Sequence, residues 1–124
     1  MIVRRIEPAH DLKKELLKIR DEIRSGVIVA GVGSLKKATL RLARENIVEF
    51  LGFFEIVSMQ GTITLDGIHV HLAIANWDGK MIGGHLKGGC EVHTTVEVAI
   101  LPYKGILRRS KDERTDFMEL NVIG

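Results

Sequence analysis

The sequence lacks several features that would place it in a specialised class of protein. Cys90 is the only cysteine among 124 residues, so no disulfide can form within the chain, and we expect a reducing compartment. No apolar run approaches the ~20 residues of a membrane span, and Met1–Arg5 lacks the hydrophobic core of a signal peptide. These absences predict a cytoplasmic protein that has no membrane partner.

The charge balance excludes a strong overall attraction to polyanions. The formal net charge is only +2, from 18 basic and 16 acidic residues that are interspersed along the chain. Basic residues gather only near the C-terminus, among acidic ones and without the interleaved aromatic side chains on which nucleic-acid bases stack. We interpret this cluster mainly as a solvated loop, with contacts to DNA phosphates as the alternative. It comprises Lys104, Arg108, Arg109, Lys111 and Arg114.

Length and hydrophobic content, 45% of the residues, predict a single domain over residues 1–124 with a real core. Apolar residues at helical spacing predict a helix from about residue 11 to 24, which Asp11 can cap and Gly26 can end. The apolar run 27–32 predicts a central strand that is covered on both faces. The glycine-rich segment after it leads into a helical turn or a longer helix at residues 35–38, and periodicity does not decide between these two.

The second half of the chain has the pattern of an antiparallel meander. Its predicted strands, separated by short turns, cover residues 53–64, 68–75, 81–86 and 91–101. A short strand over residues 1–6 precedes the helix, and an amphipathic segment at 117–122 is expected to form a sheet edge or to pair with residues 1–6. The fold class is therefore α+β, built on a mainly antiparallel sheet.

Four of the five histidines fall within 25 residues, and three of them have the spacing of ligands to one metal ion. His69 and His71 lie two apart on a predicted strand, so their side chains share a face. If His85 is the cross-strand neighbour of His71, their Cβ atoms lie about 4.5 to 5.5 Å apart, close enough to share an ion. Three neutral imidazoles can bind Zn²⁺ and leave a fourth position open. The alternative is that they are polar residues on a solvated sheet face, as we interpret His93. His10 precedes the first helix and is interpreted as unrelated to the cluster.

The register of one hairpin decides between these two interpretations. A three-residue loop closed by Asn76 and Lys80 would hold Gly79 in the left-handed conformation. Counting back from that loop sets His71 directly opposite His85. A two-residue loop would turn His85 to the other face, unless a β-bulge restored the register.

Six short motifs follow one another along the chain. They are Gly33-Ser34-Leu35, Gly52–Thr62, His69-Val70-His71, Asp78-Gly79, Gly83–Leu86 and Thr94–Glu97. In order and spacing, over nearly the whole chain, they resemble the PPC (plants and prokaryotes conserved) domain. The resemblance implies a sheet flanked by helices and assembly as a homotrimer. In single-domain prokaryotic members it also implies a His-rich metal site, which maps onto His69, His71 and His85.

Two features of the plant relatives are missing. The plant domain follows an Arg-Gly-Arg-Pro type arm that enters the minor groove of AT-rich DNA, and that tetrapeptide does not occur here. The plant motif associated with partner binding, Gly-Arg-Phe-Glu-Ile-Leu, corresponds to residues 52–57, where a phenylalanine replaces the arginine. We interpret this segment mainly as core strand or oligomer interface. The alternative is a partner site at Gly52, Phe53, Phe54, Glu55 and Ile56.

The preferred function hypothesis is a trimeric zinc-binding protein whose metal site stabilises or regulates the assembly or holds a small anionic ligand. One alternative is a DNA-associated regulatory protein. The other is a metal-dependent hydrolase, in which zinc activates a water molecule and Glu55, Glu91 or Glu97 acts as general base. Because the sequence places none of these carboxylates beside the histidines, it assigns no catalytic residue.

Overall fold

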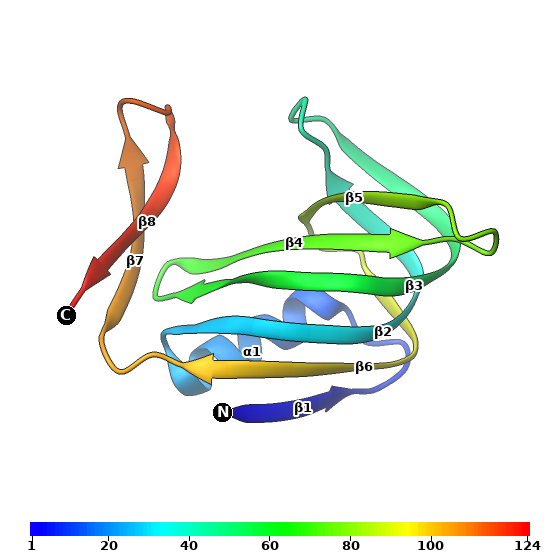
Figure 1. Ribbon diagram of the computed structural model, residues 1–124, viewed down its shortest axis with the longest axis horizontal. Coiled ribbons are helices and arrows are strands. Elements are labelled where there is room, and N and C mark those ends of the chain that lie inside the picture. The colour runs from blue at the N-terminus through cyan, green and yellow to red at the C-terminus, as the bar shows by residue number, and fades with distance from the viewer.

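Two long strands, β2 and β3, form the frame to which the other elements attach (Figure 1). The computed structural model describes residues 1–124. In chain order its elements are β1 (Ile2–Ile6), α1 (Leu12–Ile23), β2 (Gly26–Arg41), β3 (Ile47–Thr64), β4 (Gly67–Ala75), β5 (Met81–Leu86), β6 (Glu91–Pro102), β7 (Ile106–Asp112) and β8 (Phe117–Ile123). Six strands form one sheet in the order β1-β6-β2-β3-β4-β5, and β7 and β8 form a second sheet. The predicted antiparallel α+β fold is confirmed, with one helix in place of flanking helices.

Strand β2 continues through the segment that was expected to be helical. Leu35, Lys37 and Ala38 pair with β3, and Leu35 and Lys37 also pair with β6, so the prediction of a helical turn is wrong. The glycine before this segment serves strand packing instead of a turn. Gly33 has a φ of 149°, and a Cβ atom there would lie 2.2 Å from the carbonyl oxygen of Thr95 on β6. Glycine therefore allows the two strands to approach closely.

The extended β2 also lengthens its neighbour and curls the sheet. Residues 37–41 of β2 pair with 47–51, so β3 begins at Ile47 instead of residue 53. At the end of β2, Leu40 and Arg41 pair with Leu86 and His85 of β5. The last strand in the sheet order, β5, thus also pairs with β2. This pairing places Arg41 beside His85, one of the three candidate histidines.

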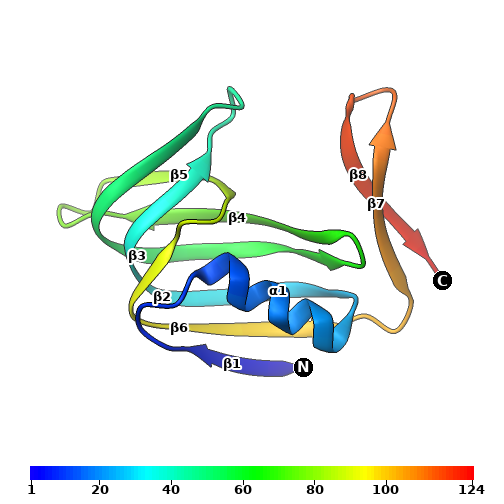
Figure 2. The same ribbon diagram turned by 180° about the vertical axis from the view of Figure 1, so that it is seen from behind.

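Helix α1 covers only one face of the sheet (Figure 2). The Asp11 carboxylate caps it by accepting a hydrogen bond from the backbone nitrogen of Lys14 at 3.1 Å. The helix ends at Ile23 and is capped by Arg24, whose φ is 73°, and not by Gly26, which begins β2. α1 spans 12 residues, and no helix of the structure has the length and hydropathy needed to cross a bilayer.

Because α1 leaves the second face open, the prediction that β2 is covered on both faces is wrong for the single chain. Ile28 is 2% exposed, whereas Val27, Val29 and Val32 are 40%, 43% and 53% exposed. The inner side chains of β2 join a continuous core with those of α1, β4 and β6. The outer apolar side chains of β2 have no cover within the chain.

The last two strands form a hairpin that stands apart from the main sheet (Figures 1 and 2). The segment 117–122 therefore pairs with β7, and not with residues 1–6, which pair with β6. Of the basic segment expected as a loop, Arg108, Arg109 and Lys111 lie on β7, whereas Lys104 precedes the strand and Arg114 lies in the turn after it. The turn between the strands is closed by the carbonyl oxygen of Asp112, which accepts hydrogen bonds from Thr115 and Asp116. The pairing of the neighbouring strands β7 and β8 thus replaces the expected pairing of residues 117–122 with the distant residues 1–6.

Two side chains of the main domain dock the hairpin. The Asp66 carboxylate accepts hydrogen bonds from the guanidinium of Arg108 at 2.9 and 3.0 Å and from the backbone nitrogen of Arg109 at 2.7 Å. The Ser25 hydroxyl accepts one from the backbone nitrogen of Leu107 at 3.0 Å. The bonds from Arg108 and Arg109 hold the pKa of Asp66 down, to about 2, so this carboxylate stays charged in mildly acidic solution.

We predict that Asp66→Asn loosens the hairpin without unfolding the domain. The neutral amide forms no ion pair with Arg108 and offers one acceptor oxygen in place of two, so β7 should separate from the rest of the domain more often. Trypsin should then cleave after Arg108 or Arg109 several-fold faster, as timed by mass spectrometry. Asp112→Asn, which removes a carboxylate within the hairpin itself, is the matched control. Equal cleavage rates in wild type and Asp66→Asn would contradict the docking role.

Candidate metal centre

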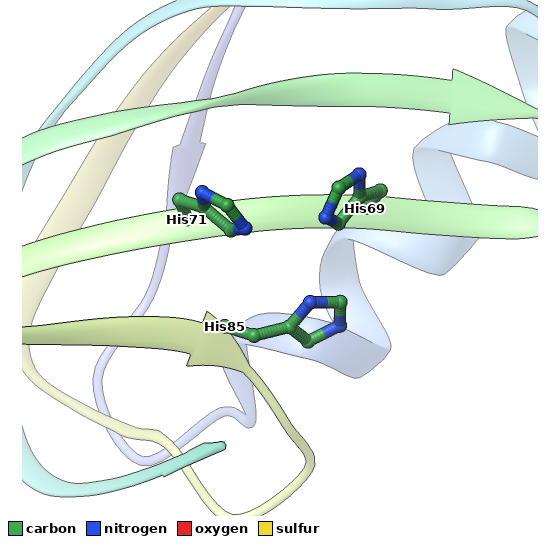
Figure 3. Close-up of side chains that lie close together, drawn as sticks. All are labelled: His69, His71 and His85. Atoms are coloured by element: carbon green, nitrogen blue, oxygen red, sulfur yellow. The ribbon is translucent and has the colours of Figure 1, made fainter. Parts of the chain in front are cut away.

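Three histidine rings meet on the face of the sheet that points away from the core (Figure 3). His69 and His71 project from β4 and His85 from β5. The ring centroids lie 4.8 Å apart for His69 and His71, 4.9 Å for His69 and His85, and 5.9 Å for His71 and His85. One ring nitrogen of each lies within 4.8 Å of those of the other two.

The hairpin between β4 and β5 has the predicted register. The backbone nitrogen of Asn76 donates to the carbonyl oxygen of Lys80 at 2.9 Å, and Gly79 has a φ of 78°. The Asn76 side-chain oxygen accepts a hydrogen bond from the backbone nitrogen of Lys80 at 3.0 Å. His71 is paired with His85 across the ladder. The three-residue loop is therefore confirmed, and the two-residue alternative is wrong.

The protonation of two of these imidazoles is set by burial. Burial lowers the pKa of His85 to about 4, and the charges of His69, Arg41 and Lys87 add to the effect. Burial also lowers the pKa of His69, with the charge of Arg109 as the next cause. Both imidazoles are therefore neutral at pH 7, and the neutral form is the one that binds metal ions.

His85 also has an unsatisfied polar atom. Its Nδ1 is buried and has no hydrogen-bond partner in the chain. A buried nitrogen without a partner costs free energy, of order 1–3 kcal/mol, unless it gains a ligand. The donor set and this nitrogen both fit a bound metal ion such as zinc.

The histidines line a cavity of about 530 Å³ whose walls carry charge. Arg41 at the end of β2 is the cross-strand partner of His85, and Lys87 follows two residues after it. The hairpin β7–β8 contributes Arg109 and Glu119. Sequence reasoning missed Arg41 and Lys87, because the pairing of β2 with β5 was not foreseen, and it considered Arg109 only for DNA.

The other histidines lie outside this group. His93 on β6 packs against the ring of Phe53, with centroids 4.5 Å apart. His10 lies before α1, with its Nε2 3.6 Å from the Glu15 carboxylate. The interpretation of both as residues unrelated to the cluster agrees with these positions.

None of the carboxylates considered as general bases lines the cavity. Glu91 instead lies 3.7 Å from the ammonium group of Lys36. The carboxylates at the cavity are Glu45, in the β2–β3 turn, and Glu119, on β8. Both were missed, because only long-range pairing brings them near the histidines.

The basic residues near the C-terminus mostly contact acidic or polar groups of their own chain. Arg109 donates from its guanidinium to the carbonyl oxygen of Met118. Lys104, in the turn before β7, forms no salt bridge. The ion pairs are Arg108 with Asp66, Lys111 with Asp116 and Arg114 with Asp112, at 2.9, 3.1 and 2.8 Å. These pairs lower the positive charge available to a DNA phosphate.

The segment 52–56 alternates between core and surface. Phe54 and Ile56 are 7% and 5% exposed, so they belong to the core. Phe53 lies on the other face, with its ring edge-on to Trp77 at a centroid distance of 5.6 Å. Trp77 is 81% exposed. The segment thus combines a core strand with an exposed aromatic pair.

The curled antiparallel sheet, its single helix and the histidine cluster on its outer face define a small β-rich domain with a candidate metal site. The particular family follows from sequence comparison. The model of the Plants and Prokaryotes Conserved (PCC) domain matches residues 1–104, so the chain belongs to this family, as its six motifs indicated.

Solved structures share this fold over nearly the whole chain. A hypothetical protein from Salmonella enterica is 30% identical, with a TM-score of 0.91 over 98% of this chain and 91% of that one. A metal-containing protein from Archaeoglobus fulgidus is 25% identical, with a TM-score of 0.81 over 95% and 90%. A proposed DNA-binding protein from Ralstonia eutropha is 21% identical, with a TM-score of 0.85 over 96% and 89%.

A curated relative is much longer than this chain. The bifunctional protein GlmU from Synechococcus sp. JA-3-3Ab is 37% identical over an alignment that covers 95% of this chain and 20% of that protein. The chain thus spans about a fifth of the length of the curated relatives it matches.

We predict that His85→Gln reduces the acid sensitivity of the metal-free protein. The pKa of His85 is about 4 in the folded state, below its ordinary value of 6.5. As pH falls from 6.5 to 4, the unfolded chain gains a proton that the folded chain does not, so folding loses stability across this window. Urea unfolding of chelator-treated protein at about pH 7.5 and pH 5 should show a smaller loss for His85→Gln than for wild type.

The matched control for this comparison is His10→Gln, which removes an imidazole remote from the cavity. The loss of stability between the two pH values should be reduced more by His85→Gln than by His10→Gln. An identical loss in all three proteins would contradict the assignment of this acid sensitivity to His85.

Proposed function

We propose that the protein is a metal-binding domain in which His69, His71 and His85 hold one zinc ion. The observation that supports this best is the approach of one nitrogen of each ring to within 4.8 Å of the others. Two nitrogens bound to a tetrahedral zinc at about 2.1 Å lie about 3.4 Å apart. Rotation of the histidine side chains can shorten the distances between their nitrogens by this amount while the backbones of β4 and β5 stay in place.

The chemistry of the three residues supports the same proposal. Neutral imidazoles bind zinc well, and His85 and His69 are neutral at pH 7 because burial depresses their pKa values. The unpartnered Nδ1 of His85 would be satisfied by a ligand. A relative of the same fold from Archaeoglobus fulgidus is described as metal-containing. When bound, zinc supplies a concentrated positive charge and a fourth position open to an exchangeable ligand.

The proposal includes self-association, with three copies as the family resemblance implies. Three neighbouring strands leave apolar side chains uncovered on the face opposite α1. Each is 40–53% exposed: Val27, Val29 and Val32 on β2, Val57 on β3 and Leu101 on β6. Burying such residues against a second copy removes apolar surface from water, at about 25 cal/mol per Å².

DNA association is the second candidate function. It is favoured by relatives of the same fold that are described as proposed DNA-binding proteins, and it draws no support from charge, because most basic groups of the hairpin are paired. Binding to DNA should fall steeply between low and moderate salt if phosphate contacts carry it. A hydrolase would instead show turnover that a chelator abolishes.

The first test is the metal content per chain of tag-free protein, measured by elemental analysis after zinc loading and removal of the excess. We expect near one zinc per chain in wild type and a near-complete loss in His71→Ala, because two imidazoles hold zinc far less tightly than three. His93→Ala removes a histidine outside the cluster and should retain the metal. Absence of zinc from the loaded wild type would overturn the proposal, and circular dichroism would establish that each variant is folded.

The proposed interface makes a separate prediction. Val32→Asp places a charge in the middle of the uncovered apolar face, so it should shift the protein from trimer to monomer in sedimentation velocity experiments. Ile47→Asp changes an exposed residue at the far end of β3, 59% exposed, and should leave the trimer intact. A monomeric wild type, or a trimer that survives Val32→Asp, would contradict this interface.

A further inference from the structure

The cavity above the three histidines carries a net positive charge, which a site for a metal cation alone would not require. Its basic side chains are Arg41, Lys87 and Arg109, and its acidic ones are Glu45 and Glu119. Three cations against two anions leave one net positive charge. A zinc ion held by neutral imidazoles would raise this to three.

Two of these cations have no partner of opposite charge in the chain. Neither Arg41 nor Lys87 takes part in any of the ten salt bridges. The guanidinium of Arg109 donates to a backbone carbonyl, which is neutral, and so it keeps its charge and further donors. Cations that line a cavity without carboxylate partners are available to an external anion.

The charges of the three cations act on the imidazoles. Burial is the largest cause of the lowered pKa values, and the charges of Arg41 and Lys87 lower the pKa of His85 further, as the charge of Arg109 does for His69. The same charges would repel a bare metal ion. An anion on the metal would turn this repulsion into attraction, since like charges at close range in a partly buried site cost free energy.

Backbone contacts of the fold place two of these cations, Arg41 and Arg109, at the cavity. Arg41 lies opposite His85 because β2 pairs with β5. The backbone of Arg109 is fixed by its hydrogen bond to the Asp66 carboxylate at 2.7 Å. Groups on two separate sheets thus converge on the space above the histidines, which is the arrangement of a site that fixes a ligand from several sides.

From this convergence we infer that the cavity binds a small oxyanion, which occupies the fourth position on the proposed zinc and is held by Arg41, Lys87 and Arg109. The inference rests on the proposed metal site. A guanidinium pairs in bidentate fashion with carboxylate and phosphate oxygens, and zinc accepts an oxygen ligand. A volume of about 530 Å³ suits a small molecule and is too small for a polymer.

The lining of the cavity also has an apolar component. Ile68 on β4 and Phe117 and Met118 on β8 line the same cavity. A ligand with a short apolar portion next to its charged group would contact them. The ligand class is therefore a small organic carboxylate or phosphate ester, and the two share the oxyanion that the cations recognise.

The experiment uses full-length protein loaded with Co²⁺, whose visible absorption changes when a ligand on the ion changes. Acetate and inorganic phosphate are added separately to wild type, and metal content is measured in parallel. We expect the spectrum to change and to saturate with one or both anions. A response to phosphate alone identifies a phosphate group as the ligand, and a response to acetate alone identifies a carboxylate.

Three variants test the residues that hold the anion. Arg41→Gln and Lys87→Gln should each weaken anion binding roughly ten-fold, as expected for loss of a charge-assisted hydrogen bond, while the cobalt content stays the same. Arg5→Gln changes an arginine on β1, at the opposite edge of the sheet order, and should bind the anion as wild type does.

The outcomes separate the inference from the metal site on which it rests. If wild type holds no cobalt and no zinc, the proposed function fails and the inference with it. If metal is bound but neither anion alters the spectrum, the inference alone is overturned. Unchanged affinity in both Arg41→Gln and Lys87→Gln also overturns it. Loss of cobalt in Glu119→Gln would identify Glu119 as the fourth ligand and so exclude an external oxyanion.

Discussion

Strand β2 is hydrogen-bonded along both of its edges, and this double pairing holds the main sheet together. One edge carries β3, and the other carries β6 and then β5. Leu40, at the end of β2, is fully buried and pairs with Leu86, while the next residue, Arg41, pairs with His85 on the outer face. Of these two adjacent residues, Leu40 therefore packs in the core and Arg41 lies at the candidate site.

The geometry of the histidine cluster is a by-product of core packing. Val70 and Leu72 on β4 are 1% and 3% exposed, and they alternate with the outward-facing His69 and His71. Full burial of each such side chain is worth about 1.5 to 3 kcal/mol. A slip of one residue would turn every one of these side chains to the wrong face. The register that serves the hydrophobic core thus also fixes the imidazoles, before any metal contributes.

The sequence predicted correctly those parts of the fold that depend on residues close together in the chain. The loop between Asn76 and Lys80 specified its own register, because Gly79 could adopt the left-handed conformation that the turn requires. The continuation of β2 was missed because Gly33 resembles a turn residue, although its role is close contact with β6. Arg41, like the rest of the charged cavity wall, depends on pairings between distant segments. No spacing in the sequence reveals such pairings.

The hairpin β7–β8 lies beyond residue 104, where the match to the family model ends. The three histidines lie within the matched part, whereas Arg109, Phe117 and Glu119 reach the same cavity from the hairpin. Hydrogen bonds to Asp66 dock the hairpin on the matched part. The cavity therefore has two parts: the histidines of the matched domain and a wall supplied by the hairpin. Relatives could acquire new ligand preferences through substitutions in the hairpin alone, with no change to the residues proposed to hold the metal.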